Sequence, residues 1–101
     1  MAGRILTEVS AVIDEQGGAA LVDGFRALLS GPVPDGLLRT ELLRGDHGQW
    51  RIQTLWRDRT ALDAMRAAVD APAALQLFRS VGAEPTLTVL EVRAGHPDAG
   101  R

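Results

Sequence analysis

The chain has 101 residues, of which 46% are hydrophobic, and a formal net charge of -2 at pH 7. This length suits one small domain with a modest hydrophobic core. All 11 basic residues are arginines dispersed along the chain, which argues against a nucleic-acid-binding protein. Cysteine is absent, which excludes disulfide bonds and thiolate chemistry. The sequence shows no signal peptide and no apolar run long enough to span a bilayer, so we expect a cytoplasmic protein without a membrane partner.

The N-terminal segment is expected to form a strand and then a helix. Residues 5–13 are rich in β-branched side chains, which favour a strand. Residues 14–18 are polar and glycine-containing, which is typical of a turn. Apolar residues then recur at helical spacing from Ala19 to Leu29, and the Ser30-Gly31-Pro32 segment ends this predicted helix.

A β-hairpin is predicted next. Pro34-Asp35-Gly36 is a turn signal, and residues 37–44 read as a strand. The four residues 45–48 begin and end with glycine and connect this strand to another that starts at Gln49. A short glycine-bracketed connection between two strands favours antiparallel pairing.

The second strand of this hairpin carries both tryptophans of the chain. Alternation places one set of its side chains on a single face: Trp50, Ile52, Thr54 and Trp56. Asp58 is a credible helix N-cap, and helical spacing continues to Val69. Two large aromatic rings on one strand face must either fill a core or line a pocket.

The C-terminal part is predicted to contain a further helix and a last strand. Pro72 can occupy the first turn of a helix whose apolar stripe ends at Val81, and Gly82 follows it. Residues 85–93 read as the last strand, so residues 1–94 form a single domain. Residues 95–101 are polar, and we expect a disordered tail there.

This order of elements predicts an α+β fold, the ferredoxin-like βαββαβ arrangement with a four-stranded antiparallel sheet. Right-handed crossovers place the first strand and the tryptophan strand in its centre. Both faces of the sheet carry apolar residues, although the helices can cover only one. We therefore expect a homodimer formed through the open face, with Leu6 and Val89 facing the partner.

Nearly the whole chain, from Ile5 to Val92, resembles the antibiotic biosynthesis monooxygenase family of dimeric α+β barrel proteins. The resemblance rests on four segments: Pro34-Asp35-Gly36 before a strand, Thr54-Leu55-Trp56-Arg57-Asp58 followed by Ala61-Leu62, Ala71-Pro72 through Leu77-Phe78, and Pro85 before the last strand. The resemblance implies a homodimer. The best-known members of the family oxidise aromatic polyketides, such as anthrones, with dioxygen and without flavin, haem or metal. No cofactor is therefore expected.

The match to this family is incomplete at the polar positions. Trp56 matches the pocket tryptophan of the family, but Ile52 stands where the oxidase members have asparagine, and tyrosine is absent. A non-catalytic ligand-binding or accessory module of the same fold is therefore the alternative function. A haem-degrading protein is a third alternative, but it requires an asparagine and a histidine ligand. His47 falls in the hairpin loop and His96 in the tail, and we predict no metal site.

These considerations select a set of candidate site residues. Trp56 is the candidate catalytic residue, through its ring and its indole N–H. The candidate substrate-binding residues come from the tryptophan strand and the helices expected beside it: Trp50, Thr54, Ile52, Phe25, Met65, Arg66 and Phe78. Three polar residues of the first strand could also reach the pocket: Thr7, Glu8 and Ser10. Arg66 could bind an anionic substrate.

Overall fold

The computed structural model describes residues 3–96, so residues 97–101 of the expected tail lie outside the described part of the chain. The strands are β1 (Ile5–Val12), β2 (Leu37–Arg44), β3 (Gln49–Trp56) and β4 (Thr86–Glu91), and the helices are α1 (Glu15–Leu29), α2 (Arg59–Ala68) and α3 (Ala73–Ser80). Within residues 3–96, no helix is both long and apolar enough to cross a membrane.

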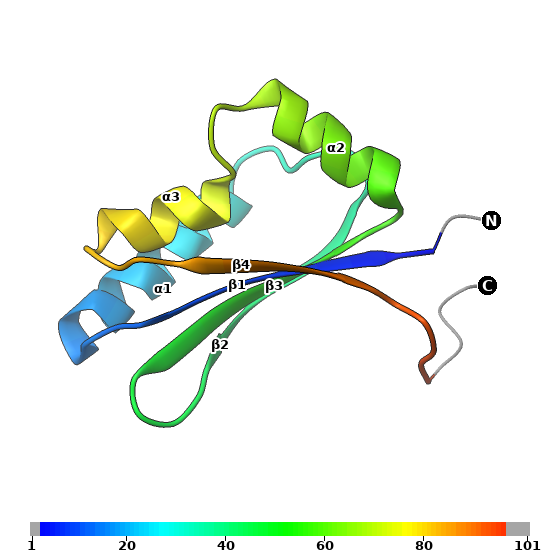
Figure 1. Cartoon of the computed structure of the whole chain (residues 1–101). Coiled ribbons are helices and arrows are strands. Elements are labelled where there is room, and N and C mark those ends of the chain that lie inside the picture. Colours follow the sequence, from blue (N-terminus) through cyan, green and yellow to red (C-terminus); the bar gives the residue numbers. More distant parts are fainter. Residues whose placement is uncertain (1–2, 97–101) are drawn as a thin grey trace.

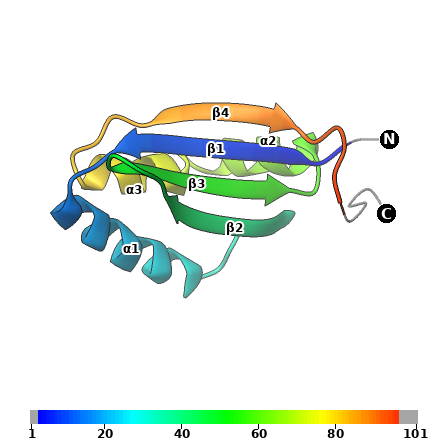
Figure 2. The same cartoon turned by 90° about the horizontal axis from the view of Figure 1, so that it is seen from below.

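The four strands form one antiparallel sheet in the order β2-β3-β1-β4. The helices lie on one face of this sheet (Figure 1). The view from below shows the strands uncovered, with the helices behind and beside them (Figure 2). The predicted ferredoxin-like fold is confirmed, including the central positions of β1 and β3.

Helix α1 begins at Glu15, so the prediction of a turn over residues 14–18 is wrong. Asp14 is the N-cap of this helix, and its Oδ1 accepts a hydrogen bond from the backbone N–H of Gly17 at 2.7 Å. Gly18 lies against the indole of Trp50, and a Cβ built on Gly18 would lie 2.6 Å from Cζ2 of Trp50. Glycine is therefore present here because the helix approaches the ring closely, and not because the chain turns.

The predicted boundaries of the later helices agree with the structure to within a few residues. Asp58 is confirmed as the N-cap of α2, since its Oδ1 accepts from the backbone N–H of Ala61 at 2.8 Å. Pro72 is the cap residue of α3, one position before the first turn predicted for it. Gly82 follows α3 with a φ of 80°, a left-handed conformation that suits glycine after a helix.

The hydrophobic core lies between the sheet and the helices in two clusters. The larger cluster joins β1 and β3 to α1 and α3 and consists of Val9, Ile13, Leu21, Phe25, Ile52 and Phe78. The smaller cluster joins the same two strands to α2 and consists of Ile5, Trp56, Ala61 and Leu62. Each central strand contributes alternate residues to both clusters, as expected for a sheet covered on one face.

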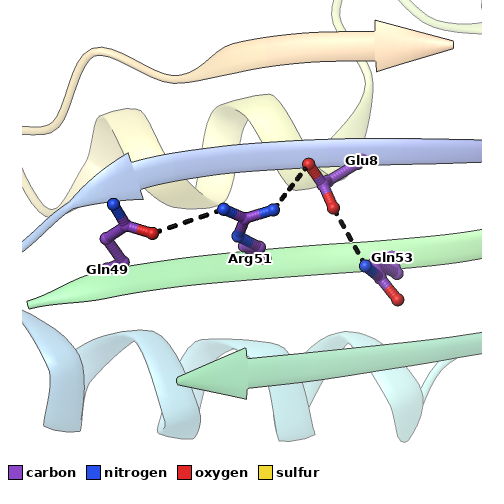
Figure 3. Close-up of polar contacts among 4 residues, drawn as sticks. All are labelled: Glu8, Gln49, Arg51 and Gln53. Atoms are coloured by element: carbon purple, nitrogen blue, oxygen red, sulfur yellow. Dashed lines mark hydrogen bonds and ion pairs between the residues drawn. The ribbon is translucent and has the colours of Figure 1, made fainter. Parts of the chain in front are cut away.

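The centre of the open sheet face is polar (Figure 3). Arg51 of β3 pairs with Glu8 of β1 through a 3.1 Å contact between Nη1 and Oε2. Gln53 donates from Nε2 to the other oxygen of Glu8 at 2.9 Å, and Arg51 also donates to Oε1 of Gln49 at 3.3 Å. The Glu8 carboxylate is therefore bound on the side of the sheet that the helices do not cover.

One end of the same face is apolar. Leu6 pairs in register with Leu55 of β3 and Leu90 of β4, and Leu90 is 45% exposed. Val89 instead pairs with Thr7, which is buried on the helix side. The expectation that Val89 faces a partner together with Leu6 is therefore wrong, because neighbouring residues of a strand point to opposite faces.

The close approach of Gly18 to Trp50 predicts that a side chain at position 18 destabilises the protein. Gly18→Ala should lower the free energy of unfolding by about 1–3 kcal/mol, because the added methyl group overlaps the indole. The intrinsic helix preference of alanine alone would raise it by roughly 0.5–1 kcal/mol. Urea denaturation followed by circular dichroism measures the difference.

Two controls test whether the loss of stability comes from the contact between the added methyl group and Trp50. In a Trp50→Leu background, Gly18→Ala should be neutral or stabilising, since the smaller side chain leaves room for the methyl group. Gly31→Ala should change stability little, because the nearest atom to its built Cβ, the backbone oxygen of Leu28, is 3.8 Å away. A Gly18→Ala protein more stable than the wild type would contradict the packing argument.

Candidate active site

A cavity of about 250 Å³ lies between the sheet and the helices. Its lining includes residues of both core clusters, such as Val9 and Ile52 from the larger cluster and Leu62 from the smaller one. Most of the other lining residues are also apolar, and they come from the end of α1 and the loop after it, from α2 and the segment leading into α3, and from β2 and β4. Such a cavity suits an apolar ligand held by a few polar groups.

Three threonines form the polar floor of this cavity. Thr7 of β1 and Thr40 of β2 both pair in register with Thr54 of β3, so the three residues form a row across the sheet. All three line the cavity, and Thr7 and Thr54 are each only 7% exposed. The hydroxyl oxygens of Thr40 and Thr54 are 2.9 Å apart, which is a hydrogen bond in which either group can be the donor.

The indole of Trp56 is held by this row. The ring is 3% exposed, and its Nε1–H donates to Oγ1 of Thr7 at 3.1 Å. Thr7 in turn donates to the backbone carbonyl of Thr54 over a longer distance of 3.5 Å. The indole N–H therefore already has a partner within the protein, while the ring itself lines the cavity.

Arg66 is the charged residue of the cavity lining, and its side chain is exposed at the surface of α2. Within residues 3–96, Arg66 forms no ion pair. Among residues 3–96, the lining contains neither a carboxylate nor an imidazole. Arg66 is therefore a group that could pair with an anion at the cavity, and the lining residues described by the structure include no side chain that could act as a general base at neutral pH.

The cavity wall includes apolar side chains that are partly open to solvent. Leu28 and Leu29 at the end of α1 are 40% and 45% exposed, and Val33 in the following loop is 51% exposed. Val69, next to the end of α2, is 44% exposed. All four residues line the cavity, so an apolar ligand entering it would first contact apolar surface.

Most of the predicted site residues meet at this cavity. Six of them line it: Trp56, Ile52, Thr54, Phe25, Met65 and Arg66. Phe78 does not line it and lies instead in the larger core cluster, where it is completely buried. Of the first-strand polar residues, Thr7 reaches the cavity, whereas Glu8 and Ser10 lie on the opposite face of β1.

Trp50 does not line the cavity either. Its ring packs against Gly18 of α1, with the guanidinium carbon of Arg44 6.0 Å from the ring centroid. The ring borders a separate open hollow beside the β2–β3 hairpin, where His47 also lies. Gly18 contacts β3 near its start, at Trp50, whereas the cavity includes Trp56 at the end of the strand. The two tryptophans therefore occupy different environments.

Thr40 is a polar residue of the cavity lining that the sequence analysis missed. The predicted hairpin closes residue 44 on residue 49 and would pair Thr40 with Gln53, whereas the structure pairs Arg44 with Trp50 and therefore Thr40 with Thr54. No feature of the sequence indicated that the apolar residues after α1, including Val33, would line the cavity. Their approach to α2 depends on how the chain crosses the sheet.

Solved structures share the fold of this chain. No family model and no curated protein matches the sequence. A variant of SnoaB, a cofactor-independent oxygenase from Streptomyces nogalater, superposes with a TM-score of 0.69 over 96% of this chain and 100% of its own, at 16% identity. Rv0793 from Mycobacterium tuberculosis gives 0.68 over 92% and 98%, at 21% identity. A candidate antibiotic biosynthesis monooxygenase from Caulobacter crescentus gives 0.68 over 91% and 92%, at 16% identity.

The chain shares the ferredoxin-like α+β fold of these solved structures. The similarity extends over the whole domain and includes β3 and α2, which together hold Trp56. At sequence identities of 16% and 21%, the similarity establishes a common fold but not the roles of individual side chains. Within this fold, the residues of the cavity must therefore be argued from their own geometry.

The hydrogen bond between Trp56 and Thr7 makes a stability prediction. Thr7→Val should lower the free energy of unfolding by about 1–3 kcal/mol, because it leaves the buried indole N–H without an acceptor. In a Trp56→Phe background the same change should cost much less, since no N–H is then present. Urea denaturation of the four proteins gives the coupling energy. Equal losses from Thr7→Val in both backgrounds would show that the bond contributes nothing.

Proposed function

We propose that this protein is a cofactor-independent monooxygenase that oxidises a planar aromatic substrate, of the polyketide or quinol type, with dioxygen. The observation that carries the proposal is the apolar cavity between sheet and helices, with the Trp56 ring in its lining and hydroxyl groups along its floor. The fold shared with a cofactor-independent oxygenase supports this reaction type.

The proposed reaction needs no external electron donor. An anthrone methylene loses two hydrogens and gains one oxygen atom, and the other oxygen atom leaves as water. The substrate therefore supplies all the electrons that reduce dioxygen. The chain would bind the ring, exclude water and stabilise the developing negative charge on the substrate oxygen.

The composition of the cavity lining suits a substrate that loses its proton without a general base from the protein. In the described part of the chain, the lining has no carboxylate and no imidazole to remove a proton, but it does contain the guanidinium of Arg66. A nearby cation lowers the pKa of a phenol or enol, so the proton can pass to solvent. Arg66 then stabilises the anion that reacts with dioxygen.

A non-catalytic ligand-binding module is the second candidate function. It is favoured by the same lining, because threonines are weak acid–base groups. It is also favoured by the absence of asparagine and tyrosine from the sequence. A module of this kind would bind the aromatic ring in the cavity and return it unchanged.

Oxygen uptake distinguishes the two functions. With a model anthrone and no added cofactor, the wild-type protein should consume oxygen faster than the spontaneous reaction. Trp56→Phe should slow this uptake by roughly 10- to 100-fold, because it removes the bond to Thr7 and alters the cavity wall. Trp50→Phe is the matched control, since Trp50 lies outside the cavity, and its uptake should be unchanged. Anthrone binding without uptake above the spontaneous rate would instead support the ligand-binding module.

We also propose that two copies of the chain associate through the open sheet face. The apolar group formed by Leu6, Leu55 and Leu90 supports this association. The bonded side chains of Glu8 and Arg51 beside it can be buried at lower cost than unpaired charges.

The dimer proposal is tested by a charge placed at Leu6. Leu6→Arg should shift the protein toward monomers in analytical ultracentrifugation, because it places an unpaired charge in the proposed apolar contact of each copy. Asp23→Arg, on the exposed side of α1, adds a positive charge elsewhere and should leave the association unchanged. Equal sedimentation of Leu6→Arg and wild type would rule out this interface.

A further inference from the structure

We propose that the hydroxyl pair of Thr40 and Thr54 donates the hydrogen bond that recognises a carbonyl or phenolate oxygen on the aromatic ligand. Trp56 is then a positioning residue that acts through Thr7. This inference deepens the proposed function, and it rests on it only in placing an aromatic ligand in the cavity.

Counting protons along the floor of the cavity leads to this assignment. The indole N–H of Trp56 is taken up by Thr7, and the hydroxyl proton of Thr7 points to the backbone carbonyl of Thr54. Thr40 and Thr54 together have two hydroxyl protons, and the bond between their oxygens uses one. Within residues 3–96, neither hydroxyl donates to any other protein group. The pair therefore keeps one proton, on residues that line the cavity.

The chemistry of this proton defines the ligand group. A hydroxyl that already exchanges a hydrogen bond with its neighbour is a better donor, because the chain of bonds polarises it. Its natural partner is an oxygen acceptor at the edge of an otherwise apolar ring, such as an aryl ketone or a phenolate. The apolar surroundings make an unpaired ligand oxygen costly, so the pair selects for oxygenated rings.

The test uses two bicyclic probes that differ by one carbonyl group, α-tetralone and tetralin. Isothermal titration calorimetry gives the affinity of each probe for the full chain, and the ratio of the two affinities reports recognition of the carbonyl. Thr40→Val/Thr54→Val should lower this ratio by roughly two- to tenfold, the value of one hydrogen bond. The conservative Thr40→Ser/Thr54→Ser protein keeps both hydroxyls and should retain the wild-type ratio.

Two further variants separate the hydroxyl pair from its surroundings. Trp56→Phe should leave the ratio within twofold of wild type, because the indole N–H is bonded to Thr7 and does not reach the ligand. Thr88→Val, on the open face of β4, is the control for replacing a threonine outside the cavity and should also leave the ratio unchanged. A ratio that falls in Trp56→Phe but not in the double valine variant would overturn the proposal.

A spectroscopic measurement tests the same bond without a variant. The carbonyl stretching band of α-tetralone bound to wild-type protein should lie below its position in an alkane solvent, because hydrogen bonding weakens the C=O bond. A band at the alkane position, or no binding of α-tetralone at all, would overturn the proposal. Neither probe needs to be oxidised, so failure of oxygen uptake with anthrone would leave this result standing.

Discussion

The hydrogen bond between the Trp56 indole and Thr7 is the interaction on which the cavity depends. The ring is 3% exposed, and a buried N–H without an acceptor costs about 1–3 kcal/mol. The ring can therefore remain between the sheet and α2 only where a neighbouring strand offers an oxygen. Thr7 offers it from β1, and the bond fixes the ring as part of the cavity lining without using a charged group.

The strand period keeps charged groups of the sheet out of the cavity. Thr7 and Thr54 point toward the helices, whereas their neighbours Glu8 and Gln53 are bonded to each other on the open face. A slip of one residue would exchange the two sets and place the carboxylate under the helices. Register thus separates an uncharged threonine floor from an ion-paired outer surface on the same two strands.

Gly18 in α1 accounts for the different surroundings of the two tryptophans of β3. Gly18 lets the helix approach Trp50, and the indole fills the space that a side chain would occupy. Trp56 faces α2 instead, where Ala61 and Leu62 pack against it. One ring is thereby placed against α1 and the other beside the cavity, although alternation puts both on the same strand face.

The sequence by itself determined the order of the elements, the fold class and the strand face that carries Trp56. These features follow from periodicity, from the Asp58 cap and from the glycine-bracketed hairpin, all of which act over a few residues. The register of the hairpin, which pairs Thr40 with Thr54, was decided only by the structure, since a four-residue link from 45 to 48 would pair Thr40 with Gln53. The turn predicted before α1 failed because glycine signals a turn locally but serves here for packing.

Only the tertiary structure decided which of these side chains share a cavity. Phe78 and Met65 both lie on apolar helix stripes, yet Phe78 is completely buried in the core and Met65 lines the cavity. Phe78 belongs to the core cluster that α3 forms with α1 and the central strands, whereas Met65 of α2 packs against the cluster that contains Trp56, and both sets of contacts join residues distant in the chain. Hydrophobic periodicity specifies the buried side of a helix, but it does not specify how closely that side packs.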